Sequence, residues 1–404
     1  MFVWTVVGQV NIKRDFPVLE KNVDLIYLDS ACTTLKPRKV IEAELDYYEN
    51  YGACASRSSH RLGRQTTQKI DEVREKIARF VGNDSEGIVW TKNATEALNL
   101  VISGLDYRAK NKVITTNMEH HAVLLPLMRL RDEGKIRLQI IDNSKESTQL
   151  VEKVEQKIDK ETALVVINSA NNTTGARTKI DEIGKISHEF GAKLAVDGAQ
   201  SVPHFKTDMK RENIDFLAFS AHKMLGPTGI GALVCKKDEL LKLRPLIVGG
   251  GNVKTVSTEQ IEWSADQSRF EAGIQNYSGI FGFGAAVEYI NKVGMENIQK
   301  HEKLIRTKMI EVIKNSGANT YGNELDTASA LVSFNFKKTK PHDVALMLDQ
   351  YKISVRSGFF CAQPAMEAIG AKEGAVRASA YLYNDENEVR KFGEVLEQVG
   401  KIYA

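Results

Sequence analysis

Hydrophobic and polar positions change their period several times along this chain, and the changes predict its elements. Between residues 87 and 235, short apolar runs alternate with longer amphipathic stretches. The short runs are typical of buried strands and the longer stretches of helices. The expected strands are Gly87–Trp90, Lys112–Thr116, Leu138–Ile141, Ala163–Ser169, Lys193–Asp197, Phe216–Ser220 and Gly231–Cys235, and the expected helices are Glu96–Ser103, Ala122–Asp132 and Ile180–Phe190. This alternation predicts an α/β fold on a mostly parallel sheet with helices on both faces.

The pattern changes after Gly282, where long charged stretches with a helical period are followed by short alternating runs. The expected helices here are Gly284–Lys292, Glu296–Asn315 and Glu386–Tyr403, and the expected strands are Ala330–Phe336 and Ile353–Arg356. We therefore expect a large α/β domain over residues 22–282. Residues 283–404 are expected to form a smaller α+β domain together with residues 1–21.

Composition narrows the class of protein. The 404 residues carry a formal net charge of only +3 and no basic run, so we expect no nucleic-acid partner. The four cysteines are scattered without a C-x-x-C pair, so no metal site is expected, and their sparseness fits a reducing cytoplasm. No apolar stretch is long enough to span a membrane. Residues 1–10 are apolar but lack the features of a signal peptide, and we interpret them as a strand or loop.

Several polar residues fall at or just after the ends of predicted strands. They are His120, Asn172, Asp197 and Lys223. Ligands of parallel α/β sheets bind at the carboxyl ends of the strands. This shared placement predicts one site at that edge of the sheet.

Lys223 is the most informative of these residues, because most lysines keep their ammonium group in water. It follows the apolar run Phe216–Phe219 and precedes a glycine-rich turn. A buried amine deprotonates more easily and can form a Schiff base with an aldehyde. Asp197 ends another apolar strand, and a carboxylate there could keep a pyridine nitrogen protonated. Enzymes that use pyridoxal 5'-phosphate need this pair of residues.

The segment from Asn93 to Glu96 is typical of a helix start, with Asn93 as N-cap and Glu96 at the capping-box position. The free N–H groups of a helix N-terminus suit a phosphate, and Thr95 could add a hydroxyl. On these residues alone, an ordinary capped helix is the simpler interpretation.

Three further residues have a functional and a structural interpretation. His120 follows a predicted strand and could stack on a cofactor ring and exchange protons, although a lone histidine is more often structural. Cys361 lies in a loop bounded by glycine and proline, where a thiol could react or pack as a small apolar group. Arg377 could bind a carboxylate with its planar fork or form a structural ion pair. We interpret Cys32, Cys54 and Cys235 as packing residues.

Together these stretches resemble the class V aminotransferase family of fold-type I pyridoxal phosphate enzymes, and within it the group II, SUF-type cysteine desulfurases, also called selenocysteine lyases. The resemblance extends over nearly the whole chain, from Tyr27 to Ser379. Its most specific segments are Met118–Ala122, Val196–Gln200, His222–Lys223 with Gly226–Gly229, Phe270–Gly273 and the Arg-Ser-Gly-x-x-Cys loop at Arg356–Cys361.

The resemblance implies a role for each matching residue. Lys223 would hold the cofactor as a Schiff base and move protons at the substrate Cα. Cys361 would attack the substrate sulfur, which leaves alanine and a persulfide on Cys361. The other roles implied are Asp197 at the pyridinium nitrogen, Gln200 at the phenolic oxygen, His120 stacked on the ring as acid or base, Thr95, Ser220 and His222 at the phosphate, Asn172 and Arg377 at the substrate carboxylate, and Arg356 at the entrance.

The sequence departs from the family pattern at three places. Phe359 and Phe360 precede the cysteine where SUF-type enzymes often have histidines. Ile274 stands where the family usually has a threonine that reaches the partner subunit's cofactor phosphate. Ser56 stands at a histidine position, so that role is not transferred. These changes leave the cofactor residues in place but bear on substrate preference and on the sulfur acceptor.

The resemblance therefore implies a cytoplasmic, homodimeric cysteine desulfurase that acts on L-cysteine. It would pass sulfur to an acceptor protein for iron-sulfur cluster assembly or another sulfur-transfer pathway. L-Selenocysteine as substrate stays open. So do another pyridoxal phosphate reaction on the same scaffold, such as transamination, epimerisation or a different β-elimination, and a non-catalytic protein that retains the cofactor, because a fold alone does not determine the reaction.

Overall fold

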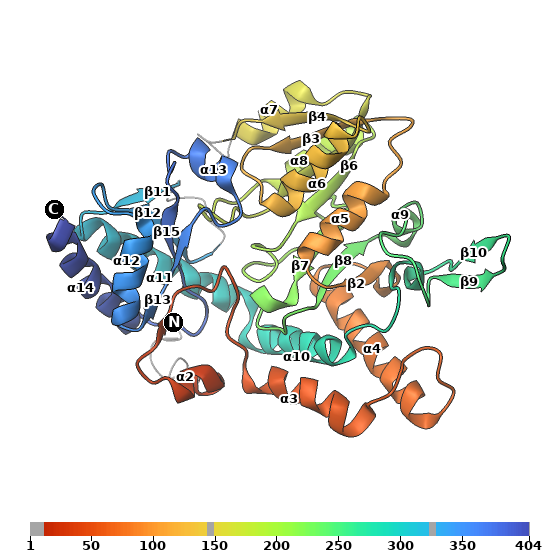
Figure 1. Cartoon of the computed structure of the whole chain (residues 1–404), viewed down its shortest axis with the longest axis horizontal. Coiled ribbons are helices and arrows are strands. Elements are labelled where there is room, and N and C mark those ends of the chain that lie inside the picture. Colours follow the sequence, from red (N-terminus) through yellow and green to blue (C-terminus); the bar gives the residue numbers. More distant parts are fainter. Residues whose placement is uncertain (1–11, 144–148, 323–328, 404) are drawn as a thin grey trace.

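The computed structural model describes residues 12–143, 149–322 and 329–403. Within these residues the larger part of the molecule is built on a sheet of seven strands in the order β2-β8-β7-β6-β5-β3-β4 (Figure 1). β8 is antiparallel to both of its neighbours, and the other pairs are parallel. The strands are β2 (Ile88–Thr91), β3 (Lys112–Thr116), β4 (Arg137–Ile141), β5 (Thr162–Asn168), β6 (Lys193–Asp197), β7 (Phe216–Ser220) and β8 (Gly231–Cys235). The predicted α/β fold with a mostly parallel sheet is confirmed.

Helices cover both faces of this sheet. On one face α5 and α6 bury Leu98 and Val123, and on the other α4, α7, α8 and α10 form a second apolar cluster. Both faces are covered, so β5 is apolar at successive positions: Leu164 faces one cluster and Val165 the other. The helices are α4 (Arg61–Phe80), α5 (Ala94–Gly104), α6 (His121–Asp132), α7 (Leu150–Lys157), α8 (Ile180–Glu189) and α10 (Tyr277–Val293).

The smaller part of the molecule contains an antiparallel sheet in the order β11-β12-β15-β14, packed against three helices. Ile305, Leu348 and Phe392 of these helices are fully buried against the sheet. The elements are α11 (Met295–Asn315), β11 (Asn319–Tyr321), β12 (Leu331–Asn335), α12 (Pro341–Gln350), β14 (Arg356–Gly358), β15 (Ala375–Ser379) and α14 (Glu386–Tyr403).

The described part of the N-terminal segment lies on this smaller part. Lys13 forms ion pairs with Asp385 and Glu388. The rings of Phe16 and Tyr383 are in contact, with their centroids 4.9 Å apart. The predicted strand or loop over residues 1–10 lies outside the described residues. β1 (Ile26–Tyr27) pairs in parallel with β13 (Ile353–Ser354).

Helix α10 lies against the larger part of the molecule and is followed in the chain by α11 of the smaller part (Figure 1). It packs against α3 (Arg38–Asp46) and α4, and the predicted boundary between residues 282 and 283 lies within it. The division of the chain into residues 22–282 and the remainder stays a prediction. The other elements are α2 (Pro17–Lys21), a π-helical turn (Tyr47–Tyr51), α9 (Lys237–Leu240), α13 (Gln363–Ala368), the short turns Ser85–Gly87, Ala221–Lys223 and Gln267–Phe270, and the projecting hairpin of β9 (Val253–Val256) and β10 (Ile261–Trp263).

Across the described ranges, no helix combines the length and the apolar character that crossing a membrane would need.

Candidate active site

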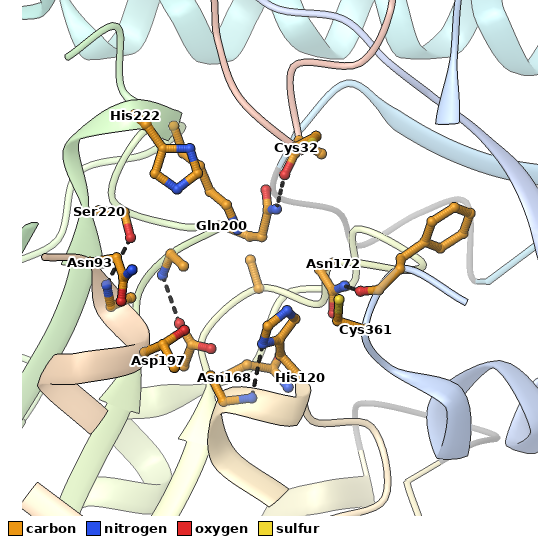
Figure 2. A pocket seen from close by; sticks show the side chains of 18 of the residues that line it. Cys32, Asn93, His120, Asn168, Asn172, Asp197, Gln200, Ser220, His222 and Cys361 are labelled. Atoms are coloured by element: carbon orange, nitrogen blue, oxygen red, sulfur yellow. Dashed lines mark hydrogen bonds between the residues drawn. The ribbon is translucent and has the colours of Figure 1, made fainter. Parts of the chain in front are cut away.

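A cavity of about 240 Å³ lies at the carboxyl ends of β5, β6 and β7. Figure 2 shows side chains from both parts of the molecule around it. The structure brings every residue that was predicted for the site to this cavity. They are Thr95, His120, Asn172, Asp197, Gln200, Ser220, His222, Lys223, Arg356, Cys361 and Arg377. Their individual roles stay predictions.

Lys223 ends a short 3₁₀ turn that directly follows β7. Burial lowers the pKa of its amine, and Asp197 opposes this shift. The preceding carbonyl, that of His222, accepts hydrogen bonds from the N–H of Thr34 and the amine of Lys36. These contacts fix the main chain at the lysine. A cavity lysine with a lowered pKa is suited to attack an aldehyde.

Asp197 ends β6, and its side chain is almost completely buried. Its Oδ1 accepts a hydrogen bond from the N–H of Ala199 at 2.9 Å. Burial raises the pKa of the carboxyl, while this hydrogen bond and Lys223 lower it. Gln200 donates to the carbonyl of Ala31 at 2.7 Å, and its Oε1 is buried without a partner. A buried oxygen of this kind is expected where a polar ligand completes the site.

The N-terminus of α5 faces the same cavity. Asn93 caps the helix by accepting from the N–H of Glu96 at 3.0 Å. The N–H of Ala94 donates to Oγ of Ser220 at 2.8 Å, so the end of β7 is joined to the helix start. A helix N-terminus flanked by the hydroxyls of Ser220 and Thr95 can bind a phosphate.

His120 is the N-cap of α6, and its Nδ1 accepts from the N–H of Ala122 at 3.0 Å. Burial, followed by the charges of Lys223, His121 and Arg377, lowers the pKa of His120 to about 3. The imidazole is therefore neutral near pH 7. Because Nδ1 accepts, the ring proton lies on Nε2.

A buried carboxyl next to His120 was not singled out from the sequence. Glu119 is fully buried and accepts hydrogen bonds from Oγ1 of Thr116 and from both the N–H and Nδ2 of Asn168. Burial raises its pKa to about 8, and the charge of Asp197 adds to the shift. The residue joins the end of β3 to the end of β5. No local period marks such a tertiary contact.

Arg377 lies on β15, in a stretch that was not predicted as a strand. Its Nη1 donates to the carbonyl of Asn172 at 2.8 Å, and its Nη2 lies 3.6 Å from Asp29. The Nε atom is buried without a partner. The guanidinium therefore keeps donor capacity for an incoming carboxylate. Arg356 is half exposed and lies 3.7 Å from the other oxygen of Asp29.

Cys361 is exposed, and its loop is attached to the same residues. The N–H of His121 donates to the carbonyl of Cys361 at 2.8 Å. Asn172 Nδ2 donates to the carbonyl of Phe360 at 2.8 Å, a bond that Figure 2 shows. Phe360 and Cys361 both have a positive φ, of 53° and 55°. The loop is therefore held in an uncommon conformation by the residues around the cavity.

Of the three cysteines that were interpreted as packing residues, only Cys32 has a different position. Cys235 is fully buried, and Cys54 is half-buried near Tyr277. Cys32 lines the cavity, so packing does not describe it fully. Asn93 and Asn168 also line the cavity without having been assigned a ligand role. Asn168 ends β5, so the strand-end rule that found Asp197 could have found it too.

Two of the departing residues lie away from this cavity. Ile274 is 66% exposed, and Ser56 has a positive φ of 68°. Neither lines the cavity. Within the described residues, no group of three or more histidine, cysteine or acidic side chains could hold a metal ion.

An amine, a buried carboxyl, an unpaired amide oxygen and a helix N-terminus thus surround one cavity. They suit a ligand that carries an aldehyde, a basic ring nitrogen and a phosphate. The thiol of Cys361 and the guanidinium of Arg377 lie on the side formed by the smaller part of the molecule. This side suits a substrate that has a carboxylate and a group open to attack by sulfur.

Known proteins are similar to this chain over nearly its whole length. The family model described as Aminotransferase class-V matches residues 26–392. A probable cysteine desulfurase of Methanothermobacter thermautotrophicus is 37% identical over 394 residues, which cover 96% of this chain and 97% of that protein. A probable cysteine desulfurase of Pyrococcus abyssi is 39% identical over 395 residues and covers 97% of each chain.

Solved structures are similar as well. The apo structure of the cysteine desulfurase from Thermococcus onnurineus NA1 has a TM-score of 0.91 at 35% identity and covers 99% of this chain and all of that chain. The structure of the cysteine desulfurase CsdA (S-sulfonic acid) from Escherichia coli has a TM-score of 0.90 at 27% identity, with the same coverage.

Proposed function

The chain belongs to the class V aminotransferase family, and on that premise we propose that it is a pyridoxal phosphate-dependent cysteine desulfurase. It converts L-cysteine to L-alanine and carries the released sulfur as a persulfide on Cys361. The observation that carries this proposal is that Lys223 and Cys361 line one cavity. A lysine alone would support many reactions of the family, whereas a thiol beside it supplies a soft nucleophile for sulfur.

The residues of the cavity fit pyridoxal 5'-phosphate. Lys223 would hold the aldehyde carbon, and Asp197 would face the ring nitrogen. The unpaired Gln200 Oε1 would receive the ring hydroxyl, and His120 would stack on the ring. Thr95, Ser220 and His222 would hold the phosphate at the start of α5. When bound, the cofactor supplies an electron sink for the substrate Cα.

This chain's residues then bind and orient the substrate. Arg377 and Asn172 receive the carboxylate of L-cysteine, which places its Cα toward Lys223 and its thiol toward Cys361. The Lys223 amine has a lowered pKa, so it can take the proton from Cα and later return one. His120 is neutral with its proton on Nε2, so this N–H can donate a hydrogen bond to a polar group in the cavity.

Cys361 completes the reaction as a thiolate. Its Sγ forms a bond to the substrate sulfur, and the substrate Cβ–S bond breaks. The electron pair of that bond stays with the substrate carbon, which is protonated at Cβ and leaves as alanine. The transferred sulfur remains on Cys361, which is exposed and therefore accessible to an acceptor protein. An acceptor for iron-sulfur cluster assembly or another sulfur-transfer pathway fits this exposure, as does a cytoplasmic location, where thiols stay reduced.

The proposal is tested by incubating the purified holoenzyme with L-cysteine and a thiol reductant. Equal amounts of alanine and sulfide are expected. Keto acid without sulfide would favour transamination instead, and no product would reject both reactions. Reduction of the resting enzyme with borohydride should leave the cofactor attached to Lys223, and attachment to another lysine would reject the assignment of that residue.

A further inference from the structure

The ring of Phe360 lies over the guanidinium that is expected to bind the substrate carboxylate. The central carbon of Arg377 is 4.6 Å from the ring centroid. Arg377 is 3% exposed, so this cation–π contact is shielded from water and is of the stronger kind. The ring therefore restricts how the guanidinium plane can turn.

The main chain of Phe360 is tied to the same group of residues. Asn172 donates its Nδ2 to the carbonyl of Phe360, while its own carbonyl accepts from Arg377. Phe360 and the following Cys361 both adopt left-handed backbone conformations, which are costly for bulky residues. Two hydrogen bonds, from Asn172 to the carbonyl of Phe360 and from His121 to the carbonyl of Cys361, hold the loop in this form. The ring is thereby kept at the cavity wall.

Phe360 is also the lining residue that directly precedes the proposed nucleophile. A substrate held by its carboxylate at Arg377 and directed toward Lys223 must place its side chain beside Cys361. The Phe360 ring occupies part of the wall there. Additional atoms on the substrate side chain would meet this ring or displace it from Arg377.

We propose that Phe360 is the specificity-determining residue of this site: it orients Arg377 and restricts the cavity to α-amino acids with a short side chain. The proposal rests on the desulfurase function given above. It assigns a role to a residue at which the chain departs from the histidine expected there.

Phe359 provides a matched control. Both phenylalanines contact the apolar cluster of Met366, Ala371 and Ala375. Only Phe360 also lines the cavity and covers Arg377. A change at Phe359 therefore tests loop packing without removing the contact to the guanidinium.

The experiment compares the holoenzyme with Phe360→Ala, Phe360→Tyr and Phe359→Ala. Steady-state kinetics gives kcat and KM for L-cysteine. Binding of S-ethyl-L-cysteine, an analogue with a longer side chain, is measured from the change in cofactor absorbance. Phe360→Ala should raise KM for L-cysteine roughly tenfold with a smaller change in kcat, and should bind S-ethyl-L-cysteine several-fold more tightly. Phe360→Tyr keeps an aromatic face over Arg377, so its KM for L-cysteine should lie much closer to the value of the parent than that of Phe360→Ala. Phe359→Ala should behave like the parent.

An unchanged preference between the two amino acids in Phe360→Ala would overturn the proposal. So would equal effects of Phe359→Ala and Phe360→Ala, which would assign the change to loop packing. If Phe360→Ala does not fold, Phe360→Leu serves the same comparison, because it also lacks the aromatic face. The binding measurement needs no turnover. A parent protein that releases no sulfide would therefore reject the desulfurase function while the selectivity of the site could still be read.

Discussion

The four cysteines of this chain occupy different surroundings, and the difference separates one reactive thiol from the others. Cys361 is exposed at the cavity, and Cys235 is sealed in the core. Burial raises the pKa of Cys235 far above its usual range, so this thiol stays protonated. Cys32 lines the same cavity as Cys361 and is the sharpest comparison for it.

Cys361→Ser should retain the cofactor and bind L-cysteine, because Lys223, Asp197 and His120 are unchanged. It should lose nearly all release of sulfide, since a hydroxyl attacks sulfur poorly and cannot hold the transferred atom. Cofactor absorbance on adding L-cysteine and the rate of sulfide release measure the two steps separately. Cys32→Ser should keep most of its activity. Unchanged sulfide release by Cys361→Ser would move the assignment to another reaction of the family.

Glu119 predicts a pH effect on stability. Its pKa is raised to about 8 in the folded protein, against about 4.3 in an unfolded chain. The folded state therefore binds the proton more tightly, and this contribution to stability is present at low pH and is lost as the pH rises toward 8. The slope approaches about 1.4 kcal/mol per pH unit between these values. Glu119→Gln removes this titration. The free energy of unfolding of the variant, relative to that of the parent, should therefore increase from pH 5.5 to pH 8.

Thermal unfolding of the holoenzyme at several pH values measures this difference. Glu155→Gln, a change of the same chemistry on the exposed surface of α7, should leave the pH dependence as it is in the parent. If the melting temperatures of Glu119→Gln and the parent differ by the same amount at every pH, Glu119 does not titrate with a raised pKa in the folded protein.

At the scale of elements, the close approach of β8 to the start of α5 shapes the proposed phosphate site. Gly231 begins β8, and a Cβ added there would lie 2.6 Å from the carbonyl oxygen of Phe219 and 2.8 Å from Cα of Asn93. Both atoms belong to the backbone, so neither can move without shifting β7 or the cap of α5. Only a glycine allows this packing.

Gly231→Ala should therefore lower stability by about 1–3 kcal/mol, the usual effect of overpacking, and weaken cofactor binding. Thermal unfolding and titration of the apoprotein with pyridoxal phosphate provide the two measurements. Gly249→Ala is the control, because the nearest atom to its added Cβ is 3.9 Å away. Cofactor affinity that is equal in both variants would show that the junction of β8 and α5 does not shape the phosphate site.

The observed strands show which elements could be predicted from sequence patterns and which could not. β3, β6, β7 and β8 begin and end at the predicted residues, because most of their positions are apolar and strand-forming. β15 was missed, since Ala375–Ser379 combines small residues with an arginine and has no clear period. Strand-end placement brought His120, Asn172, Asp197 and Lys223 to one edge correctly.

The contacts of Glu119 with β5 and of Phe360 with Arg377 could not be predicted in the same way. Each joins segments that are distant in the sequence, so neither leaves a local pattern. The roles of the site residues in binding cofactor and substrate were predicted from the resemblance to a family and not from the periodicity of the sequence.

For the whole molecule, we expect a symmetric homodimer, as the resemblance to the family implies, in which the segment Phe270–Asn276 approaches the partner subunit's cofactor. The apolar side chains of Val248 and Ile274 are 64% and 66% exposed, as expected for a surface that a second copy covers. Ile274→Asp should shift the protein toward monomer in sedimentation experiments and reduce activity at low protein concentration. Val23→Asp, at another exposed apolar residue in the N-terminal segment, should leave the dimer intact. A fully active monomeric parent would contradict this assembly.

Lys223 and Cys361 line one cavity, and sulfur transfer from the substrate to Cys361 depends on both residues acting there. Mass spectrometry of the holoenzyme after reaction with L-cysteine, without a reductant, tests this transfer most directly. The peptide with Cys361 is expected to gain the mass of at least one sulfur atom, and a reductant should remove this mass. Peptides with Cys32, Cys54 and Cys235 should gain none. Alanine formed without added sulfur on Cys361, or sulfur found on another cysteine instead, would contradict sulfur transfer to Cys361.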